Sequence, residues 1–82
     1  MNKYKLLAKI QNNMLNVRYS DLVALIKAYG FTRSRGGGSH EIFRRQDIAE
    51  IINIQNVNGQ AKSYQVKQFL HLIEKYNLVM EA

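Results

Sequence analysis

Three consecutive glycines, Gly36 to Gly38, stand near the middle of the chain and constrain its fold more than any other feature. A glycine run disfavours helices and strands, because glycine loses the most backbone freedom on folding, but it suits tight turns. Residues 31–35 and 39–45, on either side of the run, are candidates for short strands. The sequence therefore predicts a β-hairpin with the glycines at its turn.

Side chains alternate between the two faces of a strand. In the second predicted strand, this alternation places His40, Ile42 and Arg44 on one face and Glu41, Phe43 and Arg45 on the other. A third strand is expected over residues 50–55, which contain three β-branched isoleucines. The segment Asn56–Gly59 then supplies a turn.

Three segments have the apolar spacing of amphipathic helices. Residues 20–29 are the clearest, with Leu22, Leu25, Ile26 and Tyr29 forming one apolar stripe. Ser20 is the expected N-cap of this helix, and Gly30 is expected to follow its C-terminus in a left-handed conformation. The other helices are expected over residues 2–11 and 63–78, the last one capped by Ser63.

This order of elements predicts an α+β fold that forms one domain over residues 1–82. Its sheet is three-stranded and antiparallel, with helices on one face and the other face open. Residues 1–18 form an N-terminal helical extension, and residues 19–78 form the core. We find no apolar run long enough for a signal peptide or a membrane span and no cysteine, so a cytoplasmic protein is expected.

The charge balance favours a polyanionic partner. Twelve Lys and Arg residues against six Asp and Glu residues give a net charge of +6 in 82 residues. Residues 31–45 contain four arginines and one glutamate. Arginine suits bidentate contacts with phosphate groups, so nucleic acid is the expected partner.

Few residues have the chemistry of a catalytic site. The chain has no cysteine nucleophile, no close carboxylate pair and no cluster with metal-ligand spacing, and the triple glycine lacks the Lys-Ser/Thr ending of a phosphate-binding loop. The two histidines, His40 and His71, remain as candidate catalytic residues. His71 lies off the apolar stripe of its helix and is expected to be exposed.

His40 follows the glycine turn and lies between Arg33 and Arg44 in the sequence. Imidazole titrates near pH 6.5, so it can accept and donate a proton at cellular pH. RNA carries its own nucleophile, the 2′-hydroxyl, so its cleavage needs an acid/base group and phosphate neutralisation but no metal or cofactor. Each of these residues also suits a plain hairpin with a solvated surface.

Several segments together resemble the HicA family of toxin–antitoxin ribonucleases over roughly residues 19–78. They are Ser20–Val23, Gly30–Phe31, Gly38–Phe43 and Lys62–Val66. The resemblance implies a double-stranded-RNA-binding-domain-like fold and cleavage of mRNA with His40 as the catalytic residue. It also implies a HicB-type antitoxin protein that covers the site.

The expected site therefore has one catalytic residue, His40, no metal and no small-molecule cofactor. The residues expected to bind RNA are Arg33, Arg35, Gly37, Gly38, Ser39, Arg44 and Lys62. Many relatives carry a second histidine around the third strand, where this chain has Asn53–Asn56. The second acid/base group is therefore undetermined, with Lys62, Tyr64 and Arg44 as the candidates. The N-terminal helix is an addition to the family's compact form.

Two other functions are alternatives to the ribonuclease. A non-catalytic RNA-binding module of the same fold would have the same charge, because phosphate neutralisation alone gives affinity for RNA. A helix-turn-helix DNA-binding protein is disfavoured, because the two N-terminal helices are followed by a strand-rich segment instead of a third helix.

Overall fold

The computed structural model describes residues 2–37 and 39–81 and confirms the predicted α+β class. Its elements follow the predicted order, with one short strand added. They are α1 (Lys3–Asn12), α2 (Tyr19–Ala28), β1 (Thr32–Gly37), β2 (His40–Arg44), β3 (Ile52–Val57), β4 (Gln60–Ala61) and α3 (Ser63–Tyr76). No described helix is long and apolar enough to cross a membrane.

The antiparallel sheet has four strands in the order β1-β2-β3-β4, so the prediction of three was wrong by one. The extra strand, β4, has two residues and pairs with Asn56 and Val57. Asn58 and Gly59 connect β3 to β4 with φ angles of 53° and 85°. Asn-Gly with positive φ at both positions is the preferred two-residue hairpin connection, so the expected turn is a second hairpin.

The hairpin of β1 and β2 contains a β-bulge that changes which side chains share a face. Arg33 pairs with Phe43 and Arg35 pairs with Ile42, so Ser34 is the extra residue in β1. Phe43 is fully buried on the face that the helices cover. Its pairing with Phe43 therefore places Arg33 on the helix-covered side of the sheet, and after the bulge Arg35 pairs with Ile42, whose position is on the open side.

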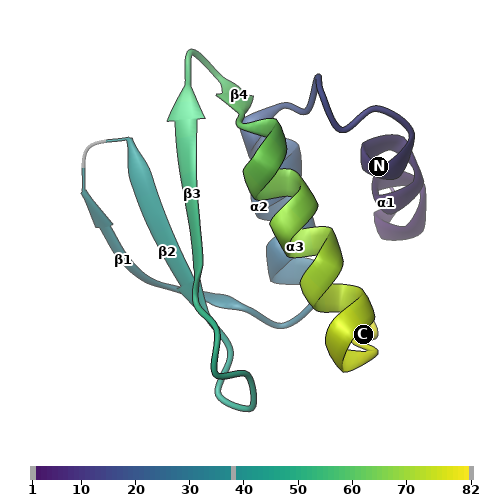
Figure 1. Ribbon diagram of the computed structural model, residues 1–82, viewed down its shortest axis with the longest axis vertical. Helices are drawn as coiled ribbons and strands as arrows, with labels where there is room; N and C mark the ends of the chain where they lie inside the picture. The colour runs from purple at the N-terminus through teal and green to yellow at the C-terminus, as the bar shows by residue number, and fades with distance from the viewer. Residues whose placement is uncertain (1, 38, 82) are drawn as a thin grey trace.

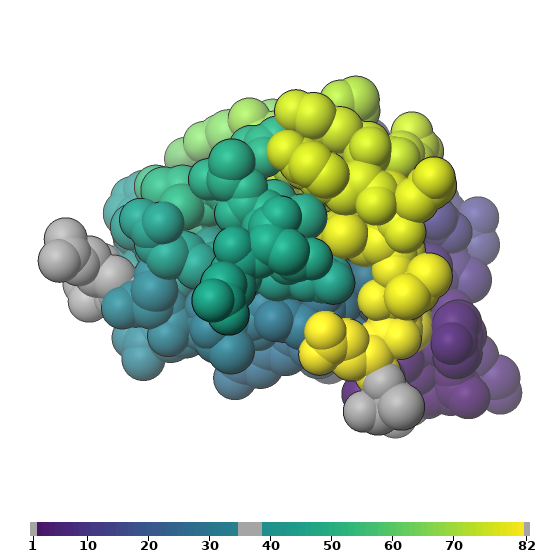
Figure 2. Space-filling view, turned by 90° about the horizontal axis from the view of Figure 1, so that it is seen from below, coloured from purple at the N-terminus to yellow at the C-terminus, as the bar shows by residue number. Residues whose placement is uncertain are grey.

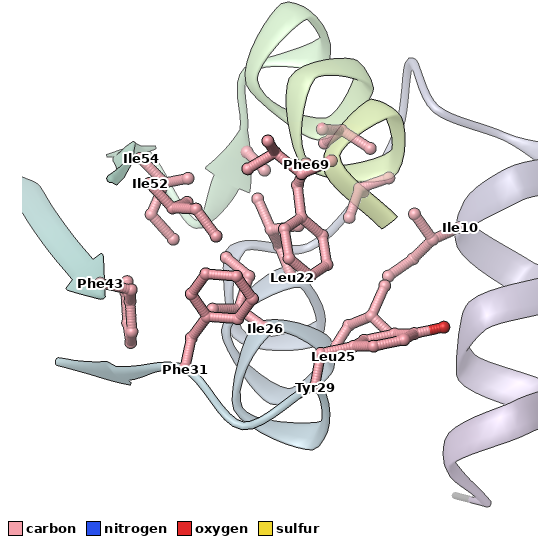
Figure 3. Close-up of a cluster of buried hydrophobic side chains, with 14 of the residues drawn as sticks. Ile10, Leu22, Leu25, Ile26, Tyr29, Phe31, Phe43, Ile52, Ile54 and Phe69 are labelled. Atoms are coloured by element: carbon pink, nitrogen blue, oxygen red, sulfur yellow. The ribbon is translucent and has the colours of Figure 1, made fainter. Parts of the chain in front are cut away.

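Helices α2 and α3 cover one face of the sheet, as predicted, and α1 packs on the far side of this helical layer (Figure 1). Three phenylalanines occupy the interior, and the ring of Phe69 meets Phe31 edge-to-face at 5.8 Å between centroids. Figure 3 shows Ile10 entering the same cluster from α1. The N-terminal helix is therefore part of the single core.

The predicted start of α2 was wrong by one residue. The helix begins at Tyr19, and Arg18 is its N-cap residue, with no side-chain cap, where Ser20 was expected. The backbone N–H of Tyr19 donates to the Gly59 carbonyl at 2.9 Å, and the N–H of Ala61 donates to Val17 at 2.9 Å. These bonds to the β3–β4 hairpin fix the helix start, and no local capping signal encodes them.

The ends of the other helices also differ slightly from expectation. α3 begins at Ser63 with Lys62 as its N-cap residue, so Ser63 is inside the helix, and it ends at Tyr76, before Asn77 in a left-handed conformation. The left-handed conformation expected at Gly30 is confirmed by a φ of 86°.

Candidate active site

His40 is the first residue of β2 and is exposed to solvent. Its backbone pairs with Gly37 of β1 on one side and with Gln55 of β3 on the other. The N-terminal ends of α2 and α3 lie at the same end of the molecule as the end of β1 and the start of β2 (Figure 1). Within the described residues, no side-chain hydrogen bond or ion pair involves the imidazole, which leaves it available to a ligand.

The open face of the sheet carries the predicted group of His40, Ile42 and Arg44. The register adds Gln55, opposite His40, and Asn53, opposite Ile42. Arg44 is four positions beyond His40, which is about 13 Å along a strand. The two side chains share a face, but they are too far apart to contact one small group at the same point.

Strand β3 holds the segment of Ser39 and His40 in place. The backbone N–H of Asn56 donates to the Ser39 carbonyl at 2.9 Å, and the Gln55 side-chain amide donates to the Ser39 hydroxyl at 3.5 Å. The backbone N–H of Gln55 donates to the Gln65 side-chain oxygen of α3 at 2.8 Å. Sequence reasoning missed Gln55 and Gln65, because their roles depend on the strand register and on where α3 packs.

Arg33, Glu41 and Tyr19 form a polar cluster on the helix-covered side of the sheet. Arg33 Nε lies 2.6 Å from Glu41 Oε2, and the Tyr19 hydroxyl donates to the other Glu41 oxygen. Burial raises the pKa of Tyr19, and the hydrogen bond to the Glu41 carboxylate raises it further. Tyr19 therefore remains a protonated donor, and Arg33 does not share the face of His40.

The remaining predicted site residues lie around the same end. Lys62 precedes α3, with its ammonium 6.0 Å from the centre of the Tyr64 ring. Lys62 directly follows β4, so β3 lies between it and β2, and this residue is about 10 Å across the sheet from His40. Gly37 ends β1, Arg35 is described only through its backbone pairing, and Gly38 lies outside the described residues.

His71 is exposed on α3, as predicted, and lies away from the open face of the sheet because α3 covers the opposite face. It lines a shallow surface depression with Lys67 and Glu74 of the same helix. The structure does not bring it together with His40.

Residues 19–74 match the family model described as the HicA toxin of bacterial toxin–antitoxin systems. The matched segment begins at the first residue of α2, contains all four strands, and ends within α3. It includes His40 and leaves out α1. No curated protein and no solved structure matches the chain.

Proposed function

The chain belongs to the HicA family of toxins, and from that membership we propose that it is a metal-independent ribonuclease toxin that cleaves mRNA in the cytoplasm. The observation that carries the proposal is the position of His40. Its imidazole is exposed at the start of β2 on the uncovered face of the sheet, two residues after the glycine run in the sequence.

The proposed reaction uses the nucleophile of the RNA itself. Neutral His40 accepts the proton of a 2′-hydroxyl as its oxygen attacks the adjacent phosphorus. The bond between phosphorus and the 5′-oxygen breaks, and the imidazolium returns its proton to that oxygen. The products are a 2′,3′-cyclic phosphate and a free 5′-hydroxyl.

RNA binding in this proposal rests on positive charge around the histidine. Arg35, Arg44 and Lys62 would contact phosphates, and the backbone N–H groups at Gly37, Gly38 and Ser39 would approach the phosphate beside His40. The expected phosphate contact of Arg33 is less direct, because its guanidinium is in an ion pair with Glu41.

A protein antitoxin of the HicB type is the proposed partner. Family membership supports an antitoxin, and the net charge of +6 favours a partner with an acidic binding surface. The gene next to this one would then encode a protein that co-purifies with the chain and blocks its activity. Failure of that neighbour to co-purify would count against the partner.

The second candidate function is a non-catalytic RNA-binding module, which one observation favours. Three residues are candidates for a second acid or base. Lys62 and Tyr64 follow β4, on the other side of β3 from His40, and Arg44 lies about 13 Å from His40 along β2. Proton transfer in the proposed reaction therefore depends on His40 alone.

The replacement His40→Ala separates the two functions, with His71→Ala as the matched control. Purified protein is incubated with single-stranded RNA in the presence of a chelator, and each variant is also expressed in growing cells. We expect His40→Ala to reduce cleavage by about 10²-fold or more and to relieve growth arrest, because it removes the acid/base group. His71→Ala should behave as the wild type.

If folded wild-type protein leaves RNA intact at high concentration, the ribonuclease proposal fails. Retained RNA affinity in that case would support the binding module.

A further inference from the structure

A notch of about 310 Å³ lies beside the proposed catalytic histidine, at the end of the sheet where α2 begins. It is lined by residues of α2, β1, β2 and β3 and by the residue that precedes β2. Its lining residues are Tyr19, Arg33, Ser39, Glu41 and Asn56. The walls are therefore mostly polar, in contrast to the apolar core beneath them.

The notch has hydrogen-bonding capacity left for a ligand. Among the residues that the structure describes, each oxygen of the Glu41 carboxylate has one partner, Tyr19 or Arg33, whereas an ionised carboxylate offers about four acceptor positions. Arg33 uses its Nε in this pair, and its side chain is 56% exposed, so its two terminal amino groups can donate.

The cluster holds these groups in a fixed arrangement. Tyr19 is buried in the first turn of α2, and its hydroxyl keeps one Glu41 oxygen in place. Arg33 fixes the other oxygen from the neighbouring strand. An acceptor and a donor group that are held side by side are suited to recognise the edge of a planar base.

Ser39 connects the notch to the proposed reaction centre. It lines the notch and directly precedes His40, so the two Cα atoms are about 3.8 Å apart. Glu41 and His40 project to opposite faces of β2. An RNA strand that crosses this end of the sheet can place a phosphate at His40 and a neighbouring base in the notch.

We propose that the notch of Tyr19, Arg33, Ser39, Glu41 and Asn56 binds one base of the RNA substrate and that it selects guanine. Guanine presents two adjacent N–H donors for the Glu41 carboxylate and one carbonyl acceptor for Arg33. The other bases do not combine two such donors with this acceptor on one edge. The proposal rests on RNA as the substrate but not on His40 as the catalyst.

The binding test uses full-length protein with His40→Ala, so that the RNA stays intact. The probes are a uridine hexanucleotide and its variants with a single G, A or C at the third position, measured by fluorescence anisotropy. We expect the G-containing probe to bind about tenfold more tightly than the others, which is the low end of discrimination by a good bidentate contact. Adding Glu41→Gln should abolish this preference.

The control for Glu41→Gln is Glu50→Gln, which removes the same charge far from the notch, beside Lys75. It should leave the preference for G intact. If thermal unfolding shows that Glu41→Gln does not fold, Arg33→Gln replaces it, since this side chain is more exposed. A purely structural role for Glu41 would lower stability without changing the ranking of the probes, and this result would overturn the inference.

The cleavage test uses active protein and maps the cut sites on a long single-stranded RNA. We expect cuts to cluster beside G in the wild type and with Glu50→Gln, and to spread evenly over the bases with Glu41→Gln. Cleavage without base preference would overturn the base site and leave the ribonuclease proposal standing. Conversely, G-selective binding that depends on Glu41, in a protein that never cleaves RNA, would uphold the base site alone.

Discussion

Gln65, in the first turn of α3, is the only buried polar side chain among the described residues, with 6% of its surface exposed. Its amide oxygen accepts the backbone N–H of Gln55 at 2.8 Å, at a point where β4 is too short to pair with β3. The side chain thus replaces a missing strand neighbour. Because Gln55 lies opposite His40, this bond also supports the proposed catalytic position.

Replacing Gln65 by Leu should lower the free energy of unfolding by about 1–3 kcal/mol, because the partly buried backbone N–H of Gln55 loses its acceptor. Urea denaturation measures this change. Gln68→Leu, at an exposed position of the same helix, is the matched control and should change stability by about 0.5 kcal/mol or less. Equal effects of the two changes would contradict the role assigned to Gln65.

At the scale of elements, the loop between β2 and β3 is held at the end of the molecule opposite the proposed site. Lys75 of α3 lies 2.7 Å from a Glu50 oxygen, and the Tyr76 hydroxyl donates to the other oxygen. Arg45, directly after β2, donates to the Tyr29 carbonyl at the end of α2 at 2.8 Å. Figure 2 shows this loop lying against the end of α3.

The contacts of Glu50 with Lys75 and Tyr76, which join the β2–β3 loop to α3, should weaken at acidic pH. The hydrogen bond from Lys75, followed by that from Tyr76, lowers the pKa of Glu50 to about 2. The pKa of a glutamate in an unfolded chain is about 4.3. The Glu50 carboxylate therefore stabilises the fold above that pH, and its contribution to the unfolding free energy disappears between about pH 5 and pH 2. The difference in unfolding free energy between wild type and Glu50→Gln should therefore be largest near neutral pH and vanish towards pH 2.

Urea denaturation at pH 7, 4 and 2 measures the difference. The Lys75 pKa is raised by the same pair, so Lys75 stays charged throughout this range. A difference that does not change with pH would show that Glu50 acts through packing alone.

At the scale of the whole molecule, the chain builds one core from segments inside and outside the family match. Ile10 of α1 is 2% exposed and lies outside the matched residues 19–74. Lys9 adds an ion pair to Asp21 of α2 at 3.3 Å. The N-terminal helix therefore closes the side of α2 that faces away from the sheet.

Ile10→Ala should destabilise the whole domain by about 2–5 kcal/mol, because it leaves a cavity in the shared core. Leu15→Ala is the control, since Leu15 is 77% exposed, and we expect almost no effect. Chemical denaturation followed by circular dichroism gives both values. A single cooperative transition with a lower midpoint is expected, whereas loss of α1 alone would show that it is an independent appendage.

Local patterns in the sequence account for much of this protein. The apolar stripe of residues 22–29 and the following glycine determined α2 and its C-terminal end, because helical periodicity and positive φ are local properties. The triple glycine predicted the first hairpin, although Gly36 and Gly37 belong to β1 and not to the turn. Strand alternation put His40 and Arg44 on one face. The helices on one face followed from a sheet too small to bury both.

Only the tertiary structure decided which residues meet. The pairing of Arg33 with Phe43 puts Arg33 on the helix-covered side, where its side chain forms an ion pair with Glu41 and does not lie beside His40. The fourth strand, the start of α2 at Tyr19 and the bond from Gln55 to Gln65 depend on contacts between segments distant in sequence. The spacing of residues along the sequence does not specify such contacts, because strand register and helix packing depend on the whole core. The role proposed for His40 could therefore be inferred from the sequence, while the polar notch beside it exists only in the folded chain.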